Sequence, residues 1–513
     1  MKKAVAKWIA LTMVVSMLGG CAGAAGNEST SKDKDVSKSE SSENTETGDA
    51  PTIKLTYITT GTEPAGLDRI EENLNELTME KIGCNVEFVP VAFADQTTKY
   101  NMWAANGEDI DIVCTVFQDY LSMINAGAFV ELDELIPEHA KDIVEKDKEK
   151  NFLAAGMYNG HMYGLATIPS APGNGGALYL RKDIYDELDT SGIDENGYIG
   201  YEEMDSLFSQ IAEKYPEYTA FGVSGNRSKS NYFYVKNYDN LGSSESTGVL
   251  VDALNDTTVE NLYATDEYYE YLTWMRKWYE AGYISKDAAT ASESADELFN
   301  AGRTASYIGM STTGTREGAE LDSGTEVVQL NMCPNWMTTN VYTGVLFFVS
   351  KNSQNPEKAV ELLNILFTDK DVINLLSNGM EGTEYEFVDK EAGRITWKDT
   401  REYINPYGVW GDQGENYVGD NQPEDFKEKC AEYLETSVEH TSLANGYKFD
   451  ATGVSTEQAT VKSVISKYLT QLEYGTVDLD TVYPEFLEEL EKAGINTIIE
   501  ENQKQLDAWL AEQ

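Results

Sequence analysis

The chain changes hydrophobic period repeatedly after its first 50 residues, and this pattern constrains the fold more than any other feature. Residues 53–58 alternate between apolar and polar side chains as a strand does, and residues 67–82 carry apolar side chains at helical spacing. A second strand is predicted over 86–91, a helix over 96–105 and a third strand over 110–114. Strands that alternate with helices in this way indicate an α/β fold with a parallel sheet.

The length of the chain predicts more than one hydrophobic core. About 460 residues follow the N-terminal 50, and single cores stop growing beyond roughly 250–300 residues. We therefore expect two lobes or more.

The charge excludes several partners. The formal net charge is −49, and a surface this acidic repels nucleic-acid phosphates and anionic lipid headgroups. We expect no nucleic-acid partner, and any attachment to a membrane must use something other than a basic patch.

The N-terminus has the pattern of an export signal. Three lysines precede an apolar run over residues 8–18, which is too short to span a membrane. The sequence Leu18-Gly19-Gly20-Cys21 resembles a bacterial lipobox. This resemblance implies that residues 1–20 are a lipoprotein signal peptide and that Cys21 is acylated, as with palmitate. An ordinary signal peptide or an N-terminal anchor helix is the alternative.

Residues 21–50 are polar and small, and we predict a disordered tether there.

The remaining cysteines and histidines give no chemical motif. Cys84, Cys114, Cys333 and Cys430 include no CxxC and no paired Cys/His spacing, so no structural zinc site is predicted. We expect isolated buried thiols, although a bond between Cys84 and Cys114 stays open. There is no GxSxG or HExxH sequence, so the chain has no recognisable hydrolase motif.

Several short segments, in a fixed order, resemble the extracellular solute-binding proteins of ABC importers. These segments are Asp109-Ile110-Asp111-Ile112-Val113, Asn125-Ala126-Gly127-Ala128-Phe129-Val130-Glu131-Leu132 and Tyr158-Asn159-Gly160-His161-Met162-Tyr163-Gly164-Leu165. Matches to family 1, the carbohydrate-binding branch, are Leu180-Arg181-Lys182-Asp183, residues 275–283, Phe299-Asn300-Ala301-Gly302-Arg303 and Asn355-Pro356-Glu357-Lys358-Ala359. Residues 375–382, Gly446-Tyr447-Lys448-Phe449-Asp450 and residues 493–507 resemble the LplA-like lipoprotein subgroup. The resemblance covers nearly all of the predicted mature chain.

This resemblance implies a two-lobed, periplasmic-binding-protein-like (type II) α/β fold with a hinge and a ligand cleft between the lobes. By similarity, residues 52–167 and 311–345 form lobe 1, and residues 168–310 and 346–513 form lobe 2. Crossings between the lobes are expected near residues 165–169, 307–312 and 342–347.

The predicted ligand is a carbohydrate, because a sugar ring offers an apolar face to aromatic side chains and hydroxyl groups to polar ones. Candidates follow the predicted strand ends, where ligands gather in α/β sheets, and come from the facing lobe. They are Thr60, Glu63, Phe117, Gln118 and Asp119 from one lobe, and Tyr232, Trp410 and Asp450 from the other. For each of them, a role in packing is the alternative. Trp278 and Trp509 lie at core-like helical spacing, and we interpret both as structural.

One loop imitates a calcium-binding EF-hand. Asp194, Asn196, Gly197, Ile199 and Glu203 match loop positions, but Gly192 replaces the first carboxylate. A plain turn followed by a helix is the favoured interpretation, so no metal site and no cofactor are predicted.

The resemblance implies binding without chemistry. The protein is interpreted as a lipid-anchored receptor, monomeric and on the extracytoplasmic face of the membrane, that delivers a sugar to an ABC permease and its ATPase. A peptide or other solute binder on the same fold is the main alternative, and a polysaccharide-active enzyme is a further one.

Overall fold

The computed structural model describes residues 50–118, 120–150, 152–171, 173, 175–193, 197–223, 236, 238–243, 245–291, 293–405 and 407–511. The predicted signal peptide and almost all of the predicted tether lie outside these residues. The described chain has two separate main hydrophobic cores, and we call the regions around them the first and the second lobe.

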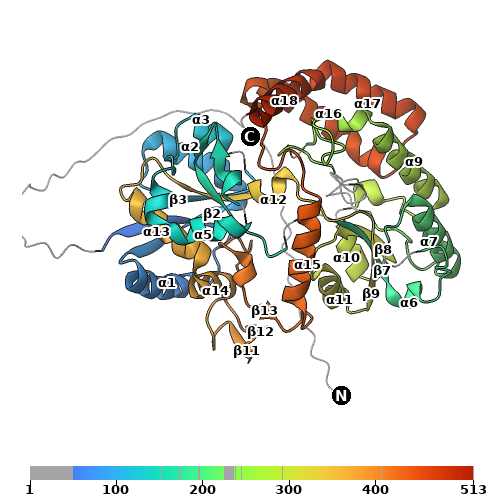
Figure 1. Cartoon of the computed structure of the whole chain (residues 1–513). Coiled ribbons are helices and arrows are strands. Elements are labelled where there is room, and N and C mark those ends of the chain that lie inside the picture. The colour runs from blue at the N-terminus through green and yellow to red at the C-terminus, as the bar shows by residue number, and fades with distance from the viewer. Residues whose placement is uncertain are drawn as a thin grey trace, which may run out of the picture. The chain divides into compact units, whose positions relative to one another are not determined.

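The first lobe is built on a five-stranded sheet with the strand order β2-β1-β3-β10-β6. Its elements, seen mainly in blue, cyan and orange in Figure 1, are β1 (Thr52–Thr59), α1 (Leu67–Lys81), β2 (Asn85–Ala92), α2 (Gln96–Asn106), β3 (Ile112–Val116), α3 (Leu121–Asn125), α4 (Leu135–His139), α5 (Lys141–Lys150), η2 (Leu153–Gly156), β4 (Met157–Tyr158), β5 (His161–Met162), β6 (Gly164–Ala166), β10 (Val345–Val349), α13 (Pro356–Thr368), α14 (Lys370–Asn378), β11 (Tyr385–Asp389), β12 (Arg394–Trp397) and β13 (Val418–Gly419).

The predicted strands and helices of this lobe are confirmed within two residues. The parallel sheet is only partly confirmed: β1 is parallel to β2 and β3, but β10 runs antiparallel to β3 and to β6. Strand β10 comes from a segment more than 200 residues further along the chain, so the local pattern could not show its direction.

Helix α1 shows how the local sequence sets these elements. Leu67, Ile70, Leu74 and Thr78 recur on one face and are all buried. The helix ends before Gly83, which has a φ of 69° and whose N–H donates to the carbonyl of Thr78. A glycine adopts this left-handed conformation without the strain that a Cβ atom causes.

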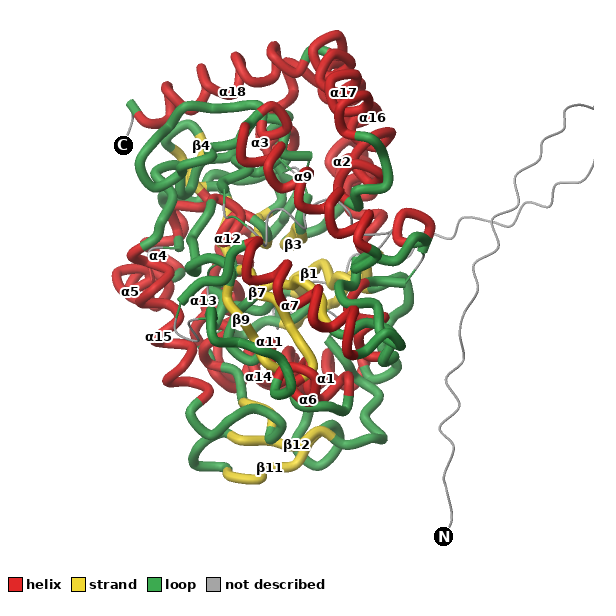
Figure 2. Tube along the Cα trace, turned by 90° about the vertical axis from the view of Figure 1, so that its right-hand side faces the viewer, coloured by secondary structure: helices red, strands yellow, loops and turns green. Residues whose placement is uncertain are grey.

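The second lobe has a small antiparallel sheet, ordered β8-β7-β9, and is mostly helical. Figure 2 shows the long C-terminal helices as successive red coils. Its elements are β7 (Gly176–Arg181), α6 (Lys182–Tyr185), α7 (Tyr201–Lys214), α9 (Asp266–Ala281), α10 (Ala295–Asn300), β8 (Ser306–Met310), α11 (Thr315–Ser323), β9 (Val327–Asn331), η6 (Ala451–Val454), α16 (Ser455–Glu473), α17 (Leu479–Ala493) and α18 (Ile495–Leu510).

The predicted lobe boundaries are wrong for two segments. The sequence predicts residues 346–513 in lobe 2, but β10, α13 and α14 from this range pack in the core of the first lobe. Residues 311–345 were assigned to lobe 1, yet β9 pairs with β7 in the second lobe. The predicted crossing near 307–312 is also wrong, because β8 and β9 belong to the same sheet.

Within the described residues the chain crosses between the lobes in three places, and the predictions near residues 165–169 and 342–347 agree with the first two of them. The first crossing follows β6 and the second lies between β9 and β10, where it contains α12 (Thr339–Thr343). The third follows β13 and contains α15 (Phe426–Glu439). The second and third crossings pair with each other, since the N–H of Met337 donates to the carbonyl of His440.

Candidate ligand-binding site

Phe117 lies immediately after β3, at the sheet edge where ligands were expected. It is not a glycine, yet its φ is 52°, and 71% of its surface is exposed. Its N–H donates to the carbonyl of Gly344 at 2.7 Å, which ties it to the second crossing. A bulky residue in a left-handed conformation costs free energy, and such strain occurs often at binding sites.

The exposed side chain of Phe117 lines a cavity of about 420 Å³ between the lobes, which we call the Phe117 cavity. The first lobe contributes Phe117 and Gln118, and the second crossing contributes Thr343 and Gly344. The second lobe supplies the remaining lining, which is Gly242, Ser243, Glu245, Lys448, Phe449, Ala451, Gln458, Ala459 and Lys462.

Polar side chains on the second-lobe side of this cavity are held by two sets of polar contacts. The buried carboxylate of Glu245 accepts from the ammonium of Lys462 at 3.0 Å. The hydroxyl of Ser243 lies 3.1 Å from that of Thr247, which also bonds to the amide of Gln458. Preorganised donors and acceptors of this kind suit a ligand rich in hydroxyl groups.

Lys448 connects the two lobes at the cavity wall. Its ammonium donates to the carbonyl of Gln118 at 3.1 Å and lies 3.8 Å from the centroid of the Tyr120 ring. Both partners belong to the first lobe, so this side chain links the lobes outside the three crossings.

A buried carboxylate anchors the crossings near the cavity. Asp239 accepts from the hydroxyl and the N–H of Thr339, at 2.8 and 3.0 Å, and its side chain also bonds to Ser442. Thr339 belongs to the second crossing and Ser442 follows the third. Burial raises the pKa of Asp239, while these hydrogen bonds lower it.

A second cavity between the lobes, about 520 Å³ in volume, lies on another side of Lys448, and we call it the Trp509 cavity. Its lining is Tyr120, Leu121, Ala154, Met157, Tyr158, Asn159 and Gly160 from the first lobe, and Asn445, Gly446, Tyr447, Lys448, Asp450, Gln505, Ala508 and Trp509 from the second. Asp450 accepts from the amide of Asn125 at 2.7 Å and from the hydroxyl of Tyr158 at 3.5 Å. Two further cavities each lie within a single lobe.

The structure brings together only some of the predicted site residues. Phe117 and Gln118 line the Phe117 cavity, whereas Asp450 lines the Trp509 cavity. Thr60 and Glu63 are exposed on the loop after β1 and line none of these four cavities. Asp119 and Tyr232 lie outside the described residues.

The prediction for Trp410 is wrong. Trp410 lies in the core of the first lobe, not in the second lobe, and only 2% of its surface is exposed. Its ring packs against Tyr57, Phe88 and Phe347, with centroids 5.8 to 6.4 Å apart, so protein side chains cover it. The sequence could not predict this position, because the chain re-enters the first lobe at β10 and the segment that contains Trp410 follows this strand.

Ser243, Glu245, Lys448, Gln458 and Lys462 were missed as cavity residues. A signal existed for Lys448, which lies in the Gly446–Asp450 motif two residues before the predicted Asp450. The others lie on loops and helix faces with no pattern that separates them from ordinary surface residues.

The EF-hand-like loop is only partly described, since Asp194 and Asn196 lie outside the described residues. The carboxylate of Glu203 accepts from the N–H of Gly200 at 2.9 Å and so caps the start of α7.

Among the described side chains, the exposed group of Glu131, Asp133 and His161 brings its ligating atoms within 4.8 Å of one another. Carboxylates cluster often on so acidic a surface, and we assign no metal there.

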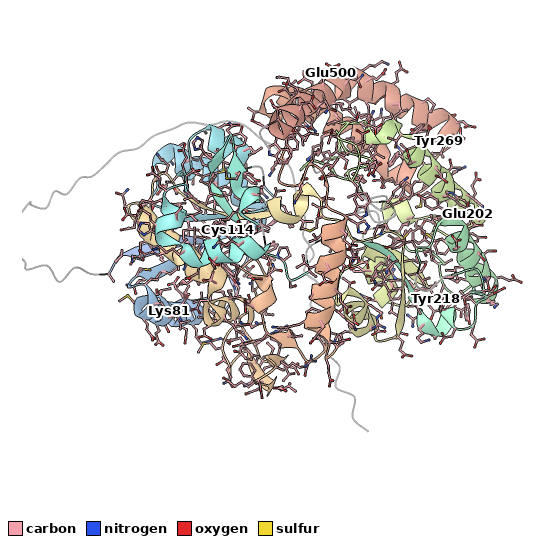
Figure 3. All side chains as sticks on the ribbon, in the orientation of Figure 1. Lys81, Cys114, Glu202, Tyr218, Tyr269 and Glu500 are labelled. Carbon is pink, nitrogen blue, oxygen red and sulfur yellow. The ribbon has the colours of Figure 1, made fainter. Side chains whose placement is uncertain are left out.

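The four described cysteines are free and buried, as expected. Cys114 lies on β3 inside the first lobe (Figure 3), and burial raises the pKa of its thiol well above the ordinary value. Burial also raises the pKa of Cys84 to about 11. Neither thiol is therefore a nucleophile near neutral pH.

Two lobes with separate cores, three crossings and cavities at their boundary define a two-lobed solute-binding protein. The comparisons agree: the model of the family "Bacterial extracellular solute-binding protein" matches residues 67–373, and the chain belongs to this family. A second family model, "Domain of unknown function (DUF3502)", matches residues 443–511.

Similar proteins extend over almost the whole chain. A carbohydrate ABC transporter substrate-binding protein from Streptococcus pneumoniae serotype 4 is 28% identical over 91% of this chain and 92% of its own length. Lipoprotein LipO from Bacillus subtilis is 23% identical, with 97% of each chain covered. The solved N-glycan transport solute binding protein (NgtS) from Streptococcus pneumoniae has a TM-score of 0.77 at 24% identity, covering 90% of this chain and 99% of that one.

The family consists of extracellular binding proteins, which agrees with an extracytoplasmic location. Over the part of the chain that the structure describes, none of the helices has the length and apolar character needed to cross a membrane.

Proposed function

We propose that this protein captures a carbohydrate in the Phe117 cavity and delivers it to the permease of an ABC importer. The observation that carries this proposal is Phe117, an exposed aromatic ring held in a strained conformation at the lobe boundary. A sugar ring can stack its apolar face on such a ring, because carbohydrate C–H groups are attracted to the electron-rich face of an aromatic.

The opposite wall of the cavity supplies the polar half of sugar recognition. Ser243 and Gln458 offer neutral donors and acceptors, and the Glu245–Lys462 pair offers charged ones. Hydrogen bonds to charged groups are stronger than neutral ones, and they orient a ligand with many hydroxyls. Phe117 and these polar groups belong to different lobes, so a ligand that contacts both favours the closed arrangement.

The similar proteins support the carbohydrate class. The solved NgtS structures include complexes with Man1GlcNAc and Man5GlcNAc, and the curated relative from the same species is named as a carbohydrate ABC transporter protein. Permease subunits and their ATPase are the partners that follow from this class, and binding without turnover is the expected activity.

Thermal unfolding of residues 51–513 against monosaccharides, oligosaccharides and short peptides tests the proposal. A ligand that binds only the native state raises the unfolding midpoint. We expect a rise with an oligosaccharide and no turnover. A rise with peptides alone, or consumption of the glycan, would contradict the carbohydrate receptor.

Phe117→Ala should weaken binding of the sugar that gives this rise by about tenfold, since stacking contributes about 1 kcal/mol. The variant should not unfold more easily, because the side chain is exposed and its conformation strained. Phe93→Ala is the control: its partly buried ring stacks on Tyr407 within the first lobe and lines neither interlobe cavity. Equal affinity of Phe117→Ala and wild type would remove Phe117 from the site.

We further propose that the protein is held at the membrane by a lipid on Cys21, after removal of residues 1–20. Cys21→Ser should abolish lipid labelling in metabolic incorporation of a palmitate analogue and release the protein from the membrane fraction. The control Cys430→Ser removes a buried thiol and should leave both unchanged. Membrane retention of Cys21→Ser would contradict the anchor.

A further inference from the structure

We infer that the Trp509 cavity is a second saccharide subsite, which receives the part of a longer glycan that the Phe117 cavity cannot hold. This inference rests on the proposed function and specifies that the binding site selects longer glycans. It also assigns a role to the C-terminal domain of unknown function, because every second-lobe residue that lines this cavity lies within residues 443–511.

The lining of the Trp509 cavity has the composition that sugars require. Tyr158 and Trp509 are partly exposed aromatic side chains, and they come from opposite lobes. Asn159, Asn445 and Gln505 add amides on both sides. Aromatic faces combined with neutral amides suit a ligand with apolar ring faces and a hydroxyl rim, as in the Phe117 cavity.

Asn445 gives an independent indication of a missing partner. Its side-chain oxygen Oδ1 is shielded from solvent and accepts no hydrogen bond within the described chain. A buried acceptor without a partner is unfavourable, because folding removes its hydrogen bonds to water and replaces them with none. If this amide rotates toward the cavity, Oδ1 loses no hydrogen bond. A sugar hydroxyl in the cavity can then donate a hydrogen bond to Oδ1.

Lys448 places the two cavities next to each other, because it lines both. Its contacts with Gln118 and Tyr120 fix the wall that the cavities share. A short saccharide fits within one cavity, whereas a longer one that passes Lys448 contacts both. The second subsite should therefore affect only long ligands.

Calorimetric titration of the mature protein with Man1GlcNAc and with the longer Man5GlcNAc tests this inference. We expect Asn445→Ala and Tyr158→Ala each to weaken Man5GlcNAc binding by about fivefold to tenfold, and to leave Man1GlcNAc binding unchanged. Tyr158→Phe keeps the ring and should retain affinity for both glycans. Asn445→Ala should not lower the unfolding midpoint, because the oxygen that it removes has no partner.

Other results separate the subsite from the proposed function. Unchanged affinity for the longer glycan in both alanine variants, or an equal loss for both glycans, would overturn the second subsite while leaving the carbohydrate receptor intact. If the wild type binds neither glycan, kestose and the longer fructo-nystose replace them as probes. If none of the four glycans binds and no carbohydrate raises the unfolding midpoint in the thermal panel, the proposed function is contradicted, and the second subsite with it.

Discussion

The two lobes bury their cores in different ways. The first lobe covers a five-stranded mixed sheet with helices, and strand β3 is buried along its whole length. The second lobe has a three-stranded sheet, and helices α7, α9 and α16 to α18 supply a large share of its core. The first core is therefore organised by strand pairing and the second by packing of amphipathic helices.

This difference changes how each lobe depends on single residues. Trp278 is a central packing residue of the second lobe: it is fully buried, and the rings of Phe208 and Phe221 meet it edge-on. Trp410 has the equivalent position in the first lobe, against Tyr57 and Phe347. Because the two cores are separate, damage to one should leave the other folded.

The largest expected effect comes from Trp278→Ala. Loss of this side chain should lower the free energy of unfolding of the second lobe by about 4 kcal/mol, through lost burial and an unfilled cavity. Hydrogen exchange should accelerate in α7 and α9 and stay slow in β1 to β3. Trp410→Ala is the matched control and should give the reverse pattern. Faster exchange in both lobes with either variant would contradict independent cores.

A smaller effect is expected at Glu473, a buried carboxylate of the second lobe. Burial raises its pKa from 4.5 to about 8, against the opposing hydrogen bond from Tyr268 at 2.9 Å. The folded state therefore retains a proton that the unfolded state releases. The stability that this proton contributes is complete below about pH 4.5 and is lost as the pH rises to about 8.

Glutamine cannot ionise, so Glu473→Gln directly tests whether the stability of the wild type falls as the pH rises. Relative to wild type, the variant should be more stable at about pH 8.5, with little difference at about pH 4.5, in chemical denaturation. Glu489→Gln is the control, because Glu489 is only partly buried and its pKa is lowered by the hydrogen bonds that it accepts from Lys467 and Tyr468. A constant difference between Glu473→Gln and wild type across this range would contradict the raised pKa.

The smallest effect concerns the link between the lobes. Lys448→Met removes the hydrogen bond to Gln118 and the contact with the Tyr120 ring. It should therefore change the free-energy difference between the open and the closed arrangement by about 1 kcal/mol. Dyes on Glu80→Cys in α1 and Glu213→Cys in α7 can report this by energy transfer, because both positions are exposed and the described native thiols are buried.

Lys467→Met is the matched control for this experiment. Lys467 also lies over a tyrosine ring, that of Tyr468, but both residues belong to α16 of the second lobe. This control should leave the energy-transfer distribution unchanged. If the two variants behave alike, Lys448 does not contribute to the interlobe equilibrium.

The sequence by itself determined the elements over residues 53–114 of the first lobe, and it determined the family. Residues 53–114 carry strand and helix periods that depend only on which side chains repeat along a few turns, and β1, α1, β2 and α2 follow them closely. The ordered motifs over nearly the whole chain indicated a solute-binding protein. Phe117 and Gln118 could be selected because loops that follow parallel strands gather at one sheet edge.

Only the tertiary structure decided which segments share a lobe. Strand β10 joins β3 across more than 200 residues, and β9 joins β7 across about 150, so no local period records either pairing. The pairing of β10 places the segment of Trp410 in the first core, and a separate contact across more than 300 residues brings the side chain of Lys448 against Gln118 of the first lobe. The burial and the partners of these side chains depend on contacts between distant segments, and such contacts exist only once the chain is folded.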